Sequence, residues 1–148
     1  MRTKTPAVFA LPFWLPLSFQ AATDQPVTSE HALREECSAY SQAGMRDCLA
    51  RKAEDSEQAL KKAENAVSAS LSRWDEDPKY ISMAKAKLAV NDKDFARYRE
   101  SRCDFAASLS GGAAGNAHEI RRLACVAELN NRRAAQLGDA LTDLPLKQ

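Results

Sequence analysis

Two cysteines placed symmetrically about a glycine-rich segment constrain this chain more than any other feature. The segment Ser108 to Asn116 (SLSGGAAGN) interrupts two helical patterns, and Gly111 and Gly112 can adopt the positive φ angles that end a helix. Cys103 lies before this turn and Cys125 lies at a similar distance after it. Two antiparallel helices would therefore bring the two sulfur atoms to the same level. A disulfide there would close a loop of about 23 residues and stabilise the fold by about 3 kcal/mol.

Helical spacing continues on both sides of the turn. Side chains at three- and four-residue steps mark one face of a helix before it: Phe95, Tyr98, Arg102, Phe105 and Leu109. The pattern resumes after it with Ile120, Leu123, Ala124, Val126, Ala127 and Leu137. Aromatic residues make up only 7% of the chain, and this composition favours thin, alanine-lined helix contacts over a thick sheet core.

We therefore predict an all-α fold, a three-helix antiparallel bundle of helical hairpins held by two local disulfides. Asp77 and Pro78 fit the N-cap and the first position of the middle helix. The expected segments are a short helical turn over 32–40, long helices from about 44 to 74, 79 to 109 and 117 to 141, and a frayed tail over 143–148. The domain itself is expected to span residues 23–142.

The first 22 residues resemble an export signal. Arg2 and Lys4 precede an apolar run from Ala7 to Leu17, which is too short to cross a bilayer as a helix. The alternative is an amphipathic or disordered N-terminus, because Pro12 and Pro16 interrupt the run. Removal of the signal leaves 19 basic and 20 acidic residues, a net charge of about −1. No basic patch indicates nucleic acid as a partner, and no membrane anchor is expected after cleavage. The expected location is periplasmic or secreted.

In an exported chain, four cysteines indicate disulfides. Cys37 and Cys48 would lie about 16 Å apart on one continuous helix, beyond the reach of a disulfide, so the chain must bend between them. Gly44 offers a place for that bend, and spacing favours the pairs Cys37–Cys48 and Cys103–Cys125. No metal site is expected, because His31 and His118 do not stand at ligand spacing from a cysteine pair.

No pattern indicates an enzyme or a cofactor site. The sequence contains no Gly-rich phosphate loop after a strand, no GxSxG, no HExxH and no CxxC. Asp75, Glu76 and Asp77 are more simply explained as a solvated helix junction than as paired catalytic acids. Tyr98, Arg99 and Glu100 form a second cluster, which has two interpretations. The cluster could be a recognition face. In the favoured interpretation it is structural: Tyr98 packs in the hairpin, and Arg99 pairs with a carboxylate of the first long helix.

A set of residues ordered along the chain resembles the lysozyme inhibitor LprI family. The set comprises Cys37, Met45, Cys48, Leu60, Tyr98, Arg99, Glu100, Cys103, Gly111, Gly112, Cys125, Arg133 and Leu137. The chain departs from that family at Phe95, Asp92 and the pair Glu57 and Lys61, where the family usually has tryptophan, glutamine and Asp or Asn. The resemblance implies a small exported helical domain in which the Tyr98 to Arg133 residues are mainly structural.

The resemblance also implies a partner: a muramidase (lysozyme) or another peptidoglycan hydrolase that this protein binds and inhibits. Asp75, Glu76 and Asp77 are the candidate contact residues, since acids on a rigid turn attract a cationic enzyme. The loop Ser110 to Asn116 offers a second, polar tip. The alternative function is a periplasmic adaptor, assembly or immunity-type module without lysozyme inhibition, because a fold does not determine a function. The sequence indicates no oligomeric state.

Overall fold

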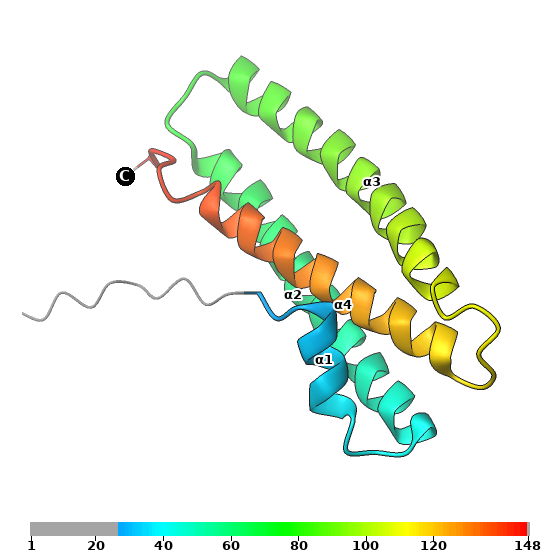
Figure 1. Ribbon diagram of the computed structural model, residues 1–148. Coiled ribbons are helices and arrows are strands. Elements are labelled where there is room, and N and C mark those ends of the chain that lie inside the picture. The colour runs from blue at the N-terminus through cyan, green and yellow to red at the C-terminus, as the bar shows by residue number, and fades with distance from the viewer. Residues whose placement is uncertain (1–26, 148) are drawn as a thin grey trace, which may run out of the picture.

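The computed structural model describes residues 27–147. They form a short helix and three long ones: α1 (Glu30–Cys37), α2 (Gln42–Arg73), α3 (Pro78–Ser108) and α4 (Ala117–Asp139). α2 and α4 lie side by side and run in the same direction, α3 runs back in the opposite direction, and α1 crosses the start of α2 (Figure 1). The all-α prediction is confirmed, with α1 as an additional helix. The predicted signal segment, residues 1–22, lies outside the described residues.

The core is a thin layer between α2 and α4. One cluster joins α1 to the first halves of these helices, and a second lies near their ends. The first contains Leu33, Cys37, Leu49, Ala53, Ile120, Ala124 and Ala127, and the second contains Leu60, Val67, Leu71 and Leu137. α3 contributes only Cys103 and Ala106 to the buried residues, and both lie in its last two turns. Along the rest of α3, only partly buried side chains such as Ala84, Leu88 and Phe95 pack against the second cluster.

Both predicted disulfides are present. Cys37 and Cys48 have their Cα atoms 5.9 Å apart, and those of Cys103 and Cys125 are 5.5 Å apart. The bend that the first pair requires lies at residues 38–41, and Gly44 instead falls within the first turn of α2. A Cβ atom at Gly44 would approach the Cβ of Tyr40 to 2.9 Å, so this glycine permits a close contact between the bend and the helix.

The helix face predicted for α3 does not pack against the bundle along its whole length. Tyr98, Phe105 and Leu109 are all more than half exposed. The side of α3 that faces the bundle instead carries Cys103 and Ala106, because the disulfide to α4 sets the rotation of the helix about its axis. Tyr98 therefore does not pack in the hairpin, and α3 presents apolar side chains to solvent.

Two glycines of the α3–α4 turn adopt positive φ, but only one is the predicted residue. Gly111 has φ 57° and Gly115 has φ 76°, whereas Gly112 keeps a conformation open to any residue. The expected frayed tail also differs from the structure. The backbone N–H groups of Asp75 and Lys147 donate to the carbonyls of Pro145 and Arg73, at 2.9 and 2.8 Å. The segment after α4 is therefore hydrogen-bonded to the α2–α3 junction.

We expect removal of the Cys103–Cys125 disulfide to weaken the whole fold. Replacing both residues by Ala should lower the free energy of unfolding by about 3 kcal/mol, because the unfolded chain regains the freedom of the closed loop. Chemical denaturation followed by circular dichroism measures the change, with Ser101→Ala on the exposed side of α3 as the control. A loss below about 1 kcal/mol would contradict this role of the disulfide.

Candidate partner-binding surface at the α2–α3 junction

The junction between α2 and α3 is a short turn whose ends are fixed by local hydrogen bonds. Trp74 follows the last residue of α2, and Asp77 caps α3, its Oδ1 accepting from the N–H of Lys79 at 2.8 Å. Glu76 Oε1 accepts from the N–H of Asp77 at 2.9 Å. Pro78 occupies the first helical turn, as predicted, where its missing N–H has no cost.

The segment that follows α4 supports this turn from the side. Trp74 and Leu146 form an antiparallel bridge, and Leu141 and Leu144 pack against the second core cluster together with Trp74. The junction is therefore held by α2, by α3 and by residues about seventy positions later in the chain. A turn held in this way keeps a defined shape on binding, and this lowers the entropy cost of association.

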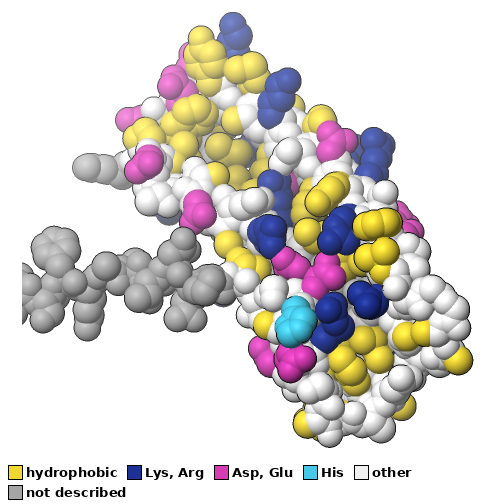
Figure 2. Space-filling model, in the orientation of Figure 1, with side chains coloured by type: hydrophobic (Ala, Val, Ile, Leu, Met, Phe, Trp, Pro, Cys, Tyr) yellow, Lys and Arg dark blue, Asp and Glu magenta, His cyan; other side chains and the backbone are white. Residues whose placement is uncertain are grey.

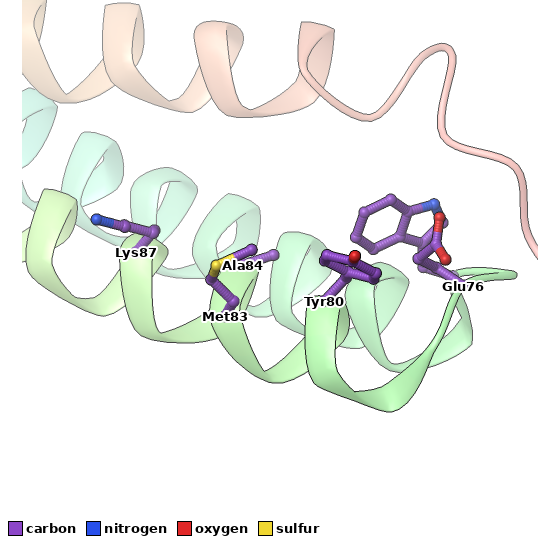
Figure 3. Close-up of a pocket in the computed structure, with 6 residues that line it drawn as sticks. Glu76, Tyr80, Met83, Ala84 and Lys87 are labelled. Carbon is purple, nitrogen blue, oxygen red and sulfur yellow. The ribbon is translucent and has the colours of Figure 1, made fainter.

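An apolar groove opens beside the turn. It has a volume of about 340 Å³ and is lined by Trp74, Glu76, Tyr80, Met83, Ala84 and Lys87. Tyr80, Met83 and Lys87 project from one side of α3, and Glu76 lies next to Tyr80 (Figure 3). Hydrophobic side chains gather around a hollow at this end of the molecule (Figure 2). We call this groove, with Asp75 and Asp77 at its edge, the junction surface.

The junction surface combines exposed acids with exposed apolar groups. Asp75, Glu76 and Asp77 are all exposed, in three consecutive positions, while Arg73 and Lys79 flank them with two positive charges. Tyr80 and Met83 are about half exposed. An apolar centre with a charged edge is the usual composition of a protein–protein contact. Of the residues predicted to meet a partner, Glu76 lines the groove, whereas Asp77 has a structural role as the helix cap.

The second predicted cluster has a different role, since Arg99 belongs to a partly buried hydrogen-bond network. Arg99 Nη1 donates to Glu57 Oε2 of α2 at 2.8 Å and to Asn130 Oδ1 of α4 at 2.6 Å. Asn130 is fully buried, and its Nδ2 donates to Ser56 Oγ at 3.0 Å and to Glu57 Oε2 at 3.2 Å. The favoured reading of Arg99, an ion pair with the first long helix, is confirmed. Sequence reasoning missed Asn130 and Ser56, because isolated polar residues give no periodic signal.

Arg133 makes the next contact along the same seam. Its guanidinium contacts Asn91 and lies 3.0 Å from Asp92 Oδ1 and 5.7 Å from the centre of the Phe95 ring. Phe95 also lies 5.9 Å from the Arg99 guanidinium, so the ring sits within cation–π distance of two arginines. These contacts tie α3 to α4 where few apolar residues do so.

Glu64 of α2 lies near this seam and titrates differently from a free glutamate. Burial raises its pKa above the ordinary 4.5, and the negative charges of Asp92 and Glu57 raise it further, against the opposing effect of Arg133 and Arg99. The folded environment therefore favours the ionised form of Glu64 less than water does.

The remaining predicted residues lie at the surface. Tyr98 and Glu100 are exposed on α3, and the Ser110–Asn116 loop is largely exposed. His118 contacts the carbonyl of Gly111 at 3.0 Å across that loop. Within residues 27–147, no group of three His, Cys, Asp or Glu residues could hold a metal ion. No helix among those residues is long and apolar enough to cross a membrane.

Comparison with known proteins gives the family. The family model for lysozyme inhibitor LprI matches residues 34–137, from the middle of α1 to the end of the α4 core contacts. The chain belongs to the LprI family. This LprI domain contains both disulfides, the Arg99 network and the junction turn, whereas the supporting segment around Leu146 follows the matched range. Comparisons with curated proteins and with solved structures find no match.

We expect Asn130→Ala to destabilise the LprI domain by about 2 kcal/mol, because it removes the buried partner of Ser56 and Arg99. Asn65→Ala, an exposed asparagine of α2, is the matched control and should change stability by less than about 0.5 kcal/mol. Denaturant unfolding of both variants measures the difference. Equal effects of the two substitutions would contradict a structural role for the network.

The raised pKa of Glu64 predicts a pH dependence of stability. The contribution of Glu64 to the free energy of unfolding is fully present below pH 4.5, the ordinary pKa of a glutamate. This contribution is lost as the pH rises through the higher pKa that Glu64 has in the folded protein. Glu64→Gln should therefore stabilise the protein more at about pH 7 than at about pH 4. Unfolding curves at both pH values measure this, with Glu54→Gln on the exposed side of α2 as control. A gain that is the same at both pH values would contradict the shift.

Proposed function

We propose that this protein is an exported inhibitor that binds a muramidase through the junction surface. Membership of the lysozyme inhibitor LprI family carries the proposal of inhibition. The shape and the composition of the junction surface support its choice as the contact. The two disulfides support a location outside the cytoplasm, because disulfides persist in oxidising compartments.

A muramidase offers matching chemistry. Such enzymes carry two carboxylates in a sugar-binding cleft, and lysozymes as a class are strongly cationic proteins. Asp75 and Glu76 would attract the positive surface, and their effect would be greatest within the screening length of about 8 Å at physiological salt. Tyr80 and Met83 would then supply the apolar contact that keeps the complex together. The acids would thus increase the association rate, and the groove would slow dissociation.

Titration of the purified, oxidised protein against chicken-type lysozyme tests the function. Cell-wall lysis is followed at low and at physiological salt. Stoichiometric inhibition that persists at physiological salt is the expected result. Absence of inhibition at micromolar excess, with helical circular dichroism intact, would reject this target and would favour the adaptor or immunity-type alternative. A pull-down from the envelope would then identify the partner.

Variants of the junction surface test where the contact lies. Asp75→Asn with Glu76→Gln should weaken inhibition about fivefold, mainly by slowing association, and should reduce its salt dependence. The matched control is Glu54→Gln with Asp55→Asn, two exposed acids on α2. Asp77 is left unchanged in both, because its side chain caps α3.

Tyr80→Ser tests the apolar part of the same surface. We expect an inhibition constant about tenfold higher, because a tyrosine at the centre of a contact contributes much of the binding energy. Tyr40→Ser, an exposed tyrosine in the bend before α2, is the control. Inhibition that is unchanged in the Tyr80 variant and in the double acid variant would place the contact elsewhere on the protein.

A further inference from the structure

One edge of α3 carries an unpartnered row of side chains. Residues at three- and four-residue steps share this edge, and we call them the α3 row: Tyr80, Met83, Lys87, Val90, Asp94 and Tyr98. The apolar members are 46%, 50%, 57% and 56% exposed in chain order. This edge faces away from the buried residues Cys103 and Ala106, so packing within the chain does not account for it. Four large exposed apolar groups aligned on one helix indicate a contact surface.

Hollows flank the α3 row along its length. The groove of the junction surface lies at its start, a second hollow is lined by Lys87, Val90 and Asp94, and a third lies between Tyr98 and Leu129 of α4. A ridge of side chains beside a line of hollows is the relief into which another helix packs. The partner surface that fits best is therefore a helix with similar relief.

The charges of the α3 row identify the occupant. We propose that a second copy of this chain docks on the row, with the two α3 helices antiparallel about a two-fold axis at Val90 and Asn91. In that register Lys87 of each copy lies level with Asp94 of the other, and Met83 lies level with Tyr98. Lys87 and Asp94 lie at equal distances from the axis, and so do Met83 and Tyr98. A single two-fold rotation therefore forms each of these two pairs twice. Such self-complementarity is what a two-fold interface requires.

The charged residues of the row are free to make this contact. Lys87 is exposed, and within residues 27–147 the ion-pair partner of Asp94 is the solvent-exposed Arg97 of the same helix, at 3.6 Å. An exposed pair of this kind contributes little energy, so its loss on docking costs little. Met83 to Tyr98 spans about 22 Å of helix. A contact of this length lies at the lower end of interface sizes, where weak and transient complexes are found, so we expect a weak dimer.

Charge exchange tests the register. Lys87→Glu and Asp94→Lys should each raise the dimer Kd about tenfold, because each sets like charges opposite one another twice per dimer. The double variant should return the Kd to within about threefold of the original. Sedimentation equilibrium of the full chain measures these values, and circular dichroism verifies the fold. A monomer at all concentrations, unchanged single variants, or a double variant without recovery would each overturn the proposal.

A cysteine at the proposed axis gives an independent test. Val90→Cys should form a disulfide-linked dimer on mild oxidation, since the axis places the two residues 90 beside each other. Ala89→Cys is the matched control, exposed but on the opposite edge of α3, and it should remain monomeric. Equal crosslinking of both variants would overturn the proposal. No muramidase is present in these experiments, so their outcome is independent of the proposed inhibition.

Discussion

The covalent bond between Cys103 and Cys125 determines how the outer helix sits on the rest of the protein. α3 is 31 residues long, yet its buried residues are confined to the turns beside this disulfide. α2 and α4 form a conventional apolar contact, whereas α3 is held by the disulfide, by a few partly buried side chains such as Leu88 and Phe95, and by the arginines around Phe95. A helix attached in this way stays in place without a wide apolar face. Its remaining side chains are then available for other contacts.

The polar seam between the three long helices complements the disulfide. Arg99, Glu57 and Asn130 meet where the layer between α2 and α4 is thin, and Arg133 and Asp92 continue the seam toward the junction. Each of these hydrogen bonds requires a particular partner, so the seam fixes how α3 lies along α4 more strictly than alanine contacts could. Such specificity has a cost, since buried charges must be desolvated, and the raised pKa of Glu64 is one sign of it.

Much of the fold follows from local features of the sequence. Cys103, Cys125 and the glycine segment between them predict the hairpin, and Asp77 with Pro78 predicts the start of α3 within one residue. The rotation of α3 is not predictable in the same way. Phe105 and Leu109 have helical spacing, but spacing alone does not show whether a face meets the core or solvent, and here it meets solvent. Asn130 and the pairing of Trp74 with Leu146 depend on contacts between distant segments, which no local pattern contains.

The position of Leu146 has a consequence for how members of this family can diverge. The family match ends at residue 137, before the segment that pairs with Trp74 beside the groove. The disulfides and the polar seam thus lie within the shared domain, while the segment that is hydrogen-bonded to the junction turn follows it. Changes of length or sequence after Leu144 can reshape this surface while Leu141 and Leu144 keep their place against the second core cluster. A common scaffold could in this way acquire different targets through a segment that lies outside its defining pattern.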